Sequence, residues 1–463
     1  MIPRRFSKIA PLKKLLVALL ILACVTVSVP VGAYLFWAKA EQDVLRRIQT
    51  QIKQGGLPIS HADLFPRIPS DDRNAAPLLK KAAELVKQMP QDSAALRCVP
   101  GNGFKNDTAK LPEKKIAEVR SFLAEPAAIE VVKLLSEASG KGECYFARDY
   151  AKGISLQIPD ATSMLSAIRL LLNHSWCLAA DGDVAGAVRD IYSGMRICEF
   201  YMDDPLLITW LVGVACEQMC LSAEMNLIST SELTSVEIDD LENLVKKRRE
   251  TVRALLVRAL DGERVFFGGS IFERFLSSNI SRQAFLAEID SQGTAKAIDW
   301  AYRNPLRPLL VADYAAYLRF MLGTRNVILD PQAGERDAMK LVEEIPRTAL
   351  LTRLSAPALA NLARKLHEVE VTLDLSTLGL EAEKIRIASG HYPQSLAEIP
   401  WEGALPRDPF TGGDFHYKAD DGNLLIYSVG PDLVDNHGTP TRVKGERDIV
   451  WSARHSAHPA ETK

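Results

Sequence analysis

The N-terminal part of the chain contains an uninterrupted apolar run without a charged residue over residues 15–37. As a helix this run is about 34 Å long, and the hydrocarbon core of a bilayer is about 30 Å thick. Five basic side chains and no acidic one precede it, namely Arg4, Arg5, Lys8, Lys13 and Lys14. The pattern predicts a single transmembrane helix, with residues 1–14 as a basic cytoplasmic tail and the bulk of the chain on the outer side.

The main alternative to an uncleaved anchor is a cleaved signal peptide. Residues 31–33 form a weak cleavage site, and residues 22–24 faintly match a lipoprotein signal. The apolar run is about twice as long as the apolar core of an ordinary signal peptide, and it continues well beyond Cys24. We therefore expect an anchor in the cytoplasmic membrane and a periplasmic or other extracytoplasmic location for the rest.

After the apolar run, polar residues return and helical periodicity continues. Residues 38–70 predict a polar helical stem, which ends at Gly55 and Gly56, and then a Pro-rich linker. In residues 71–347 apolar positions recur with the period of a helix. This part of the chain therefore predicts an extracytoplasmic α-helical domain.

Several helices of this domain have visible limits. Asp71 or Asp72 is the predicted N-cap of the first helix, which reaches Met89. The others follow from apolar stripes and from the Gly, Pro and Asp residues between them. They are expected at residues 113–123, 127–139, 160–202 (a pair), 206–227, 235–267 and 305–323.

The helical pair is the clearest of these predictions. Its first apolar stripe ends at Gly182 and Asp183, and a second stripe begins at Val184. The pair resembles one hairpin of a tetratricopeptide-type repeat, over about one repeat. The next helix is apolar nearly all round, which predicts burial, whereas the basic run at residues 246–250 predicts a solvated face.

The pattern changes at the end of the chain. Residues 348–389 predict a helix, with a weak point at residues 375–379, and Gly390 is its predicted left-handed C-cap. Asp421 and Gly422 then predict the turn of a β-hairpin. Alternating apolar side chains flank this turn, namely Phe415, Tyr417, Leu424 and Ile426.

A loop and a last strand complete this module. Residues 428–438 are rich in Gly, Asp and Asn, which predicts a loop, and residues 448–451 predict a strand. We therefore expect a small β-module at residues 390–455, followed by a disordered tail at 456–463.

The order of the motifs YPQSL, LPRDPF, FHYK, IYSVGPD and ERDIVW resembles the C-terminal globular domain of the major pseudopilin of type II secretion, over about 60 residues. The resemblance implies a long helix that ends at a Gly-x-Tyr-Pro turn and leads into a small antiparallel sheet. It also implies a calcium site in the loop after the Tyr-Ser-x-Gly-x-Asp motif. Asp432 and Asp448 match the family's carboxylates by position, and Asp435 is the candidate third ligand.

The chemistry of the loop agrees with calcium, which takes six to eight oxygen ligands from carboxylates, amides and backbone carbonyls. The predicted ligands are Asp432, Asp435, Asn436 and Asp448. The alternative is that Asp and Asn only cap turns, as their side chains often do. A nearby set of basic residues, Arg442, Lys444 and Arg447, opposes cation binding.

The chain also departs from the pseudopilin pattern. It lacks that family's N-terminal cleavage site, and roughly 350 residues separate the apolar run from the module. As a whole it resembles families of exported, membrane-anchored bacterial helical proteins that have no assigned activity. The predicted fold class is mainly α, with one transmembrane helix, an α-helical body with tetratricopeptide-like hairpins and a small antiparallel β-module of pseudopilin type.

Composition changes this picture little. The chain has 463 residues, of which 47% are hydrophobic and 25% charged, which suits a globular protein of two or three domains. It carries 56 Lys+Arg and 58 Asp+Glu, and the basic tail lies before the apolar run, so the exported part is net acidic. Nucleic acid is therefore not an expected partner.

The cysteines divide into two groups. Cys98 and Cys144 lie in loop-like sequence and are the predicted disulfide in an oxidising compartment. The second group lies in apolar helical patterns and is predicted to consist of buried thiols, which behave as small apolar side chains. Its members are Cys177, Cys198, Cys216 and Cys220.

The sequence contains none of the common catalytic signatures, such as a Gly-x-Ser-x-Gly elbow, a His-Glu-x-x-His helix or a P-loop. His174 and Cys177 are one helical turn apart, and we interpret them as packing residues. We interpret Glu370 and Asp374 as part of a solvated helix face. The expected function is a membrane-anchored scaffold that binds a protein partner in secretion or envelope assembly, and the alternative is an exported hydrolase.

Overall fold

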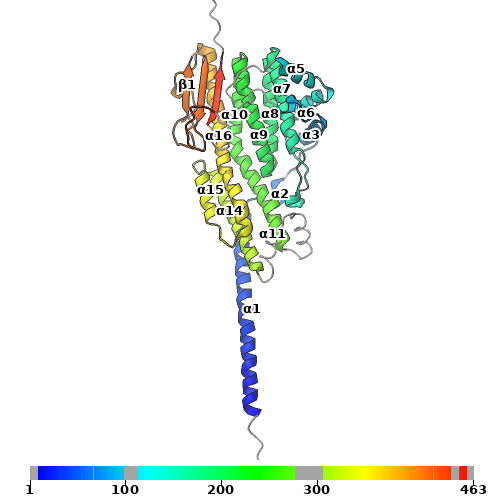
Figure 1. Cartoon of the computed structure of the whole chain (residues 1–463), viewed down its shortest axis with the longest axis vertical. Helices are drawn as coiled ribbons and strands as arrows, with labels where there is room; N and C mark the ends of the chain where they lie inside the picture. Colours follow the sequence, from blue (N-terminus) through cyan, green and yellow to red (C-terminus); the bar gives the residue numbers. More distant parts are fainter. Residues whose placement is uncertain are drawn as a thin grey trace, which may run out of the picture. The chain divides into compact units, whose positions relative to one another are not determined.

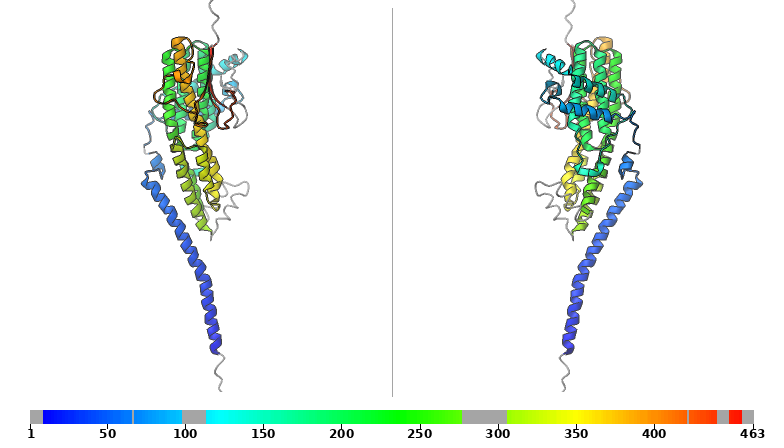
Figure 2. Two further views of the ribbon diagram at one scale, coloured as in Figure 1. Left: turned by 90° about the vertical axis from the view of Figure 1, so that its left-hand side faces the viewer. Right: turned by 90° about the vertical axis from the view of Figure 1, so that its right-hand side faces the viewer.

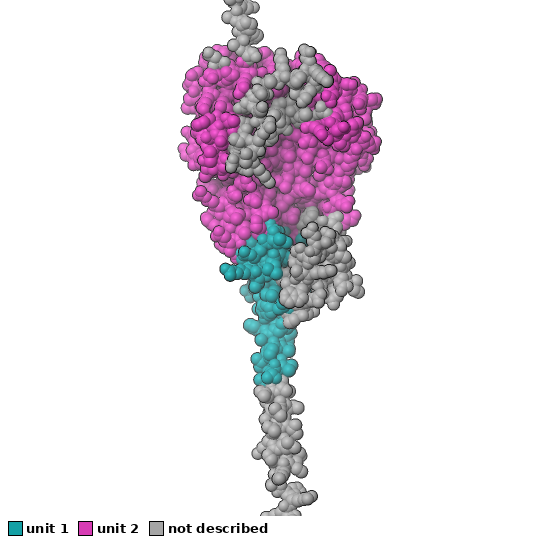
Figure 3. Space-filling model, viewed as in Figure 1, with its two compact units in different colours: residues 1–57, 269–320, 345–355 teal, residues 58–268, 321–344, 356–463 magenta. Residues whose placement is uncertain are grey.

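The computed structural model describes residues 9–65, 67–97, 113–276, 306–420, 422–439 and 448–455. These residues form a mainly helical protein with a small three-stranded antiparallel sheet near the C-terminus (Figure 1). The fold class predicted from the sequence is confirmed at this level. The contacts divide the chain into two units, which Figure 3 shows in different colours.

The first unit comprises residues 1–57, 269–320 and 345–355. It contains the long helix α1 (Ile9–Gln54), which has Pro30 in its interior and is curved (Figure 2). It also contains α11 (Gly269–Leu276) and the first part of α14 (Arg307–Leu329), where Phe272 stacks on Tyr314 with ring centroids 4.8 Å apart.

The predicted transmembrane helix falls within α1. A search of the described residues finds no helix with the length and apolar character that crossing a membrane requires. Residues 1–8 and the side chains of residues 9–24 lie outside the described set. The predicted span at residues 15–37 therefore stays a prediction.

The second unit comprises residues 58–268, 321–344 and 356–463. Its core consists of four long helices, in which α8 packs against α7, α9 and α10. Several shorter elements surround this core. The core helices are α7 (Ala161–Ala180), α8 (Val184–Asp203), α9 (Leu207–Thr230) and α10 (Ser235–Gly262), and the others are α2 (His61–Leu64), α3 (Ala76–Gln88), α4 (Ala94–Arg97), α5 (Glu113–Leu123), α6 (Pro126–Ser139), η1 (Tyr150–Ser155), η2 (Glu263–Gly268) and α15 (Glu335–Glu343).

Local sequence signals explain where the core helices begin and end. Gly182 adopts a φ of +87° between α7 and α8, and the Asp183 side chain caps α8 by accepting a hydrogen bond from the Gly186 N–H at 2.8 Å. A capping box of Thr234 and Glu237 begins α10. The helical pair predicted at residues 160–202 is thus confirmed, although its likeness to a tetratricopeptide hairpin stays a prediction.

Two expectations about helices are wrong. Neither Asp71 nor Asp72 caps α3, because the Asn74 side chain accepts the hydrogen bond from the Ala76 N–H at 3.1 Å. The helix α16 (Leu350–Ser389) continues through residues 375–379 without interruption. This stretch is buried on more than one side, which favours an unbroken helix despite its Ser, Thr and Gly residues.

The end of α16 agrees with the sequence. Gly390 has a φ of +83° and ends the helix, and a single turn of 3₁₀-helix, η3 (Leu396–Glu398), follows. The strands β1 (His416–Asp420), β2 (Asn423–Ser428) and β3 (Ile449–Arg454) then pair in the order β1-β2-β3. Their apolar face includes Phe415, Leu424, Ile426, Trp451 and Ala453, all buried.

Candidate functional site

The predicted metal ligands lie in the loop that connects β2 to β3. Ser428, the last residue of β2, pairs with Ile449, the first residue of β3. Asp448 therefore returns to the sheet beside the start of the loop, although it is distant in sequence from Asp432. The basic residues of this loop, at positions 442, 444 and 447, lie outside the described residues.

Asp448 is the centre of the loop. Its side chain is buried, Oδ1 accepts a hydrogen bond from the Asn436 N–H at 3.2 Å, and Oδ2 accepts one from the Gly438 N–H at 2.7 Å. Gly438 has a φ of +74°, and a Cβ at this position would lie 2.8 Å from the Leu425 side chain. The carboxylate and the glycine together hold the loop against the sheet.

The other predicted ligands cap local turns. Asp432 Oδ1 accepts a hydrogen bond from the Val434 N–H at 3.2 Å, whereas its Oδ2 is buried and has no hydrogen-bond partner. Asp435 Oδ1 accepts one from the His437 N–H at 2.8 Å, which lowers the pKa of this exposed carboxyl. The amide of Asn436 donates to the Val434 carbonyl at 3.1 Å.

The structure thus places the four predicted ligands in one loop but not around one point. Among the described residues, no group of three or more His, Cys, Asp or Glu side chains is arranged to hold a metal ion. Asp432 Oδ2 is the carboxylate oxygen with unused hydrogen-bonding capacity. The loop also has unusual backbone geometry, because Leu433 and His437 adopt positive φ angles of 59° and 57°.

Sequence reasoning missed a second buried aspartate beside the loop. Asp408 Oδ2 accepts a hydrogen bond from the Ser428 hydroxyl at 2.9 Å, and the Ser428 oxygen accepts one from the Gly430 N–H at 3.0 Å. Asp408 Oδ1 also accepts from the Phe410 N–H at 2.9 Å. The Asp-Pro sequence at residues 408–409, a common turn initiator, was the available signal.

The sheet meets the helices at Trp451. A Cβ on Gly379 of α16 would lie 2.3 Å from the indole ring, so the ring packs directly on the helix backbone. Glu224 of α9 is fully buried here and accepts a hydrogen bond from the Ser376 hydroxyl at 2.7 Å. Burial raises the pKa of Glu224 to about 7, against the smaller effects of Ser376 and the Trp451 indole.

Ion pairs inside the helical part overturn two expectations from the sequence. Glu370 and Asp374 are buried rather than solvated, and the Arg249 guanidinium binds both, at 3.0 and 2.8 Å. The solvated face predicted for residues 246–250 is confirmed for Lys246, Lys247 and Glu250, which are exposed, but is wrong for the arginines between them. Arg248 is fully buried and pairs with Glu217 at 2.6 Å. In each case the partner is remote in sequence, so no local pattern reveals it.

A further buried ionic cluster surrounds Arg148. Its guanidinium donates to Asp160 at 2.9 and 3.0 Å and to Asp204 at 2.8 Å. The Tyr150 hydroxyl donates to Asp204 at 2.7 Å, and the Tyr201 hydroxyl donates to Asp160 at 2.6 Å. Burial raises the pKa of Asp204, whereas hydrogen bonds from Arg148 and Tyr201 outweigh burial at Asp160 and lower its pKa.

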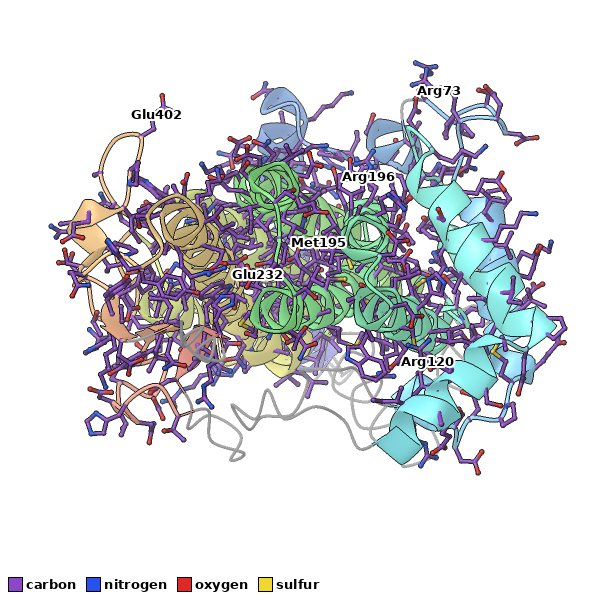
Figure 4. All side chains as sticks on the ribbon, turned by 90° about the horizontal axis from the view of Figure 1, so that it is seen from above. Arg73, Arg120, Met195, Arg196, Glu232 and Glu402 are labelled. Atoms are coloured by element: carbon purple, nitrogen blue, oxygen red, sulfur yellow. The ribbon has the colours of Figure 1, made fainter. Side chains whose placement is uncertain are left out.

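His174 and Cys177 lie one helical turn apart on α7. His174 Nδ1 lies 2.6 Å from Oδ2 of Asp190 on α8, and this hydrogen bond raises the pKa of the histidine. Figure 4 shows the helices end-on, with Met195 of α8 between them and Arg120 of α5 beside α7. Arg120 binds the exposed Asp181 with two hydrogen bonds of 2.7 Å.

The predictions for the cysteines have different outcomes. The thiols of Cys177, Cys198, Cys216 and Cys220 are buried, as predicted, whereas Cys144 is half-buried and Cys98 lies outside the described residues. The Cys98–Cys144 disulfide therefore stays a prediction.

A groove between α7 and α9, lined by Trp176 and Asn226 among others, holds little more than a water molecule.

Comparison with known proteins adds no further constraint. No protein-family model, no curated protein and no solved structure matches the chain.

Proposed function

We propose that the chain is a membrane-anchored extracytoplasmic scaffold protein whose C-terminal module, residues 390–455, is of the pseudopilin type. In this proposal residues 15–37 are the anchor, and the loop between β2 and β3 binds a protein partner. The proposal draws on the apolar run, on the order of the C-terminal motifs and on the arrangement of the loop.

The observation that carries the proposal is the exposure of the Leu433 and Val434 side chains to solvent. Both apolar side chains are more than half exposed, at 54% and 55%, in a loop that Asp448 holds in place. Leu433 keeps a positive φ, which costs a bulky residue free energy and is typical of positions under a functional constraint. Exposed apolar side chains on a segment that a buried carboxylate holds suit protein binding.

Calcium fits part of this loop. Asp432 Oδ2 is a buried carboxylate oxygen without a partner, and each oxygen of Asp448 uses only one of its acceptor positions. Asp432, Asp435, Asn436 and Asp448 would hold the ion, and the ion would supply the positive charge that lets these carboxylates approach one another. We propose that it stiffens the loop for its partner.

The calcium part of the proposal is tested by thermal melts of the detergent-solubilised full-length chain with calcium and with a chelator. Calcium should raise Tm, because a ligand at about 100 times its Kd stabilises the folded state by about 2.7 kcal/mol. Asp432→Ala should abolish this rise, whereas Asp420→Ala, a change to an exposed carboxylate in the hairpin, should keep it. Equal Tm values for the wild type under both conditions would refute calcium binding.

The scaffold part is tested by crosslinking in intact cells followed by affinity purification. The double variant Leu433→Asp and Val434→Asp should lose a protein that crosslinks to the wild type, because charged side chains cannot enter an apolar contact. The matched control is Lys418→Asp, an exposed change on β1. Retention of the same partners by the loop variant would contradict the proposal, as would cytoplasmic recovery of the whole chain after cell fractionation.

The alternative, an exported hydrolase, has weaker support. Three carboxyls have pKa values raised toward neutrality, Glu224 and Glu263 to about 7 and Asp374 to about 6. Glu224 and Asp374 are buried and engaged, by Ser376 and by Arg249 respectively, and burial alone raises the pKa of Glu263. Their environments are those of packing contacts, which also perturb pKa values.

A further inference from the structure

Three of the buried thiols form a cluster where α8 crosses α9. Cys198 belongs to α8, whereas Cys216 and Cys220 are one turn apart on the same face of α9. All three side chains have 2% or less of their surface exposed. Both α9 thiols hydrogen-bond to Cys198, so Cys198 is the common member of the cluster.

Two glycines allow the close approach of the helices. A Cβ on Gly213 of α9 would lie 3.0 Å from the carbonyl oxygen of Cys198. A Cβ on Gly194 of α8 would lie 2.9 Å from the sulfur of Cys220. A disulfide needs Cα atoms about 4.4–6.8 Å apart, and adjacent helices approach so closely only where their side chains are small.

The electrostatic environment favours reaction at Cys198. Burial opposes ionisation of this thiol, but hydrogen bonds from Cys216 and Cys220 and the nearby charge of Arg248 lower its pKa to about 5. Arg248 is held in place by Glu217 at 2.6 Å. Cys198 is therefore the natural thiolate nucleophile of the three, and the α9 cysteines, whose pKa values are raised, keep their protons.

We propose that Cys198 forms a disulfide bond with one of the two α9 cysteines as the chain folds under oxidising conditions. The third thiol stays beside the bond and can exchange with its α9 neighbour. That the bond forms in the cell rests on the extracytoplasmic location proposed above, whereas the ability to form it depends only on the folded geometry.

The reaction needs a disulfide oxidant such as glutathione disulfide. The Cys198 thiolate attacks one sulfur of the oxidant, which forms a mixed disulfide and releases one glutathione thiolate. Cys216 or Cys220 then loses its proton and attacks the Cys198 sulfur, which releases the second glutathione. Two protein thiols thus lose two protons and two electrons, and the oxidant is reduced to two thiols. Because the folded sulfurs are buried, the oxidant reaches Cys198 when α8 opens locally from α9, and the second attack follows once the two helices have repacked.

The test is to refold the detergent-solubilised full-length chain with a glutathione redox buffer, to alkylate free thiols and to map crosslinked peptides by mass spectrometry. We expect Cys198 to be joined to Cys216 or Cys220, while Cys177 is alkylated. Reduction should then lower Tm by several degrees, because the bond restricts the unfolded chain. Complete alkylation of Cys198, or its pairing with Cys177 or Cys144, would overturn the proposal.

Single cysteine variants test whether the bond depends on the positions of the three thiols or arises from nonspecific oxidation. Cys216→Ala and Cys220→Ala should each still form a bond to Cys198, with the α9 cysteine that remains. Cys198→Ala should leave both α9 thiols free, and Cys177→Ala should behave like the wild type. If Cys216 and Cys220 pair with each other in the Cys198 variant as readily as with Cys198 in the wild type, the central role of Cys198 is wrong. Because these samples are refolded in vitro, the result does not depend on where the cell places the chain.

Discussion

A buried aspartate organises each of two regions of the molecule, but the two regions satisfy it in different ways. In the β-module, Asp448 accepts hydrogen bonds from backbone N–H groups of Asn436 and Gly438, close by in sequence. In the helical part, Asp204 accepts from the side chains of Arg148 and Tyr150, more than fifty residues away. The first arrangement closes a loop through hydrogen bonds that span 12 and 10 residues, and the second is a tertiary ion pair.

The difference matters for both energy and prediction. A carboxylate that accepts backbone N–H groups loses only hydrogen bonds when it is replaced. A buried carboxylate that depends on a cation becomes an uncompensated charge when the cation is removed, which costs far more. The helical part should therefore be much more sensitive to single substitutions than the loop.

The largest effect is expected for Arg148→Met. The change leaves Asp160 and Asp204 buried without a cation, and breaking such a buried pair costs about 3–5 kcal/mol. Tm and the denaturant midpoint of the full-length chain measure the loss. Arg120→Met is the matched control, since its pair with Asp181 is exposed and should contribute little. Equal effects of the two substitutions would remove the distinction between buried and exposed pairs.

The same distinction explains what the sequence could predict. The break between α7 and α8, the Gly390 cap and the hairpin of β1 and β2 depend on residues within a few positions of one another, and these predictions are correct. The residues of the candidate site were also recognisable, because Asp and Asn in a Gly-rich stretch mark a loop. Their arrangement around Asp448 was not, since it depends on the pairing of Ser428 with Ile449.

Two of the wrong predictions concern charged residues whose partners are distant in sequence. Glu370 and Asp374 have the spacing of a solvated face, and their burial is explained by Arg249 and Arg253, more than a hundred residues earlier. Arg248 likewise sits in a run of charges that is typical of a surface, and its partner Glu217 is on another helix. Periodicity records which side chains share a face of a helix, but not what covers that face.

The second effect concerns Glu224, at the contact between the two regions. Its folded pKa of about 7 is above the ordinary value of 4.5, so the folded chain binds the proton more tightly than the unfolded chain. The proton on Glu224 therefore stabilises the folded chain by about 3 kcal/mol. This stabilisation is present in full below about pH 4.5 and is lost as the pH rises to about 7. The slope of Tm against pH across this window measures it.

Glu224→Gln removes the titration and keeps an acceptor for Ser376. The variant should lose this part of the pH dependence and should be more stable than the wild type above pH 7. Glu232→Gln, a change to a mainly exposed carboxylate, should leave the slope unchanged. A wild-type slope that survives in the Glu224 variant would assign the pH dependence to other groups.

A smaller effect is expected for Gly379→Ala, which tests the contact of β3 with α16. The added methyl group would lie 2.3 Å from the Trp451 ring, so the sheet must shift, and overpacking of this kind costs about 1–3 kcal/mol. Gly140→Ala is the control, because its Cβ would make only an ordinary contact of 3.5 Å. Near-ultraviolet circular dichroism of the tryptophans reports the displacement, and an unchanged spectrum with unchanged Tm would show that Trp451 is not packed as described.

The smallest effect is expected for Asp448→Asn. The amide keeps one acceptor oxygen for Asn436 or Gly438 but replaces the other with a donor that faces a backbone N–H, so the loss is about 1–2 kcal/mol. The loss should be local, because the ladder between β2 and β3 and the packing of Trp451 do not depend on the carboxylate. Hydrogen exchange should therefore accelerate at the amides of Asn436 and Gly438 and stay unchanged in α8 and α9. Asp414→Asn, an exposed change before β1, should alter neither region. Asp448→Asn could instead lower the stability of the helices as much as Arg148→Met does. The loop aspartate would then be part of the global core, and the contrast between the loop and the ion pair would be lost.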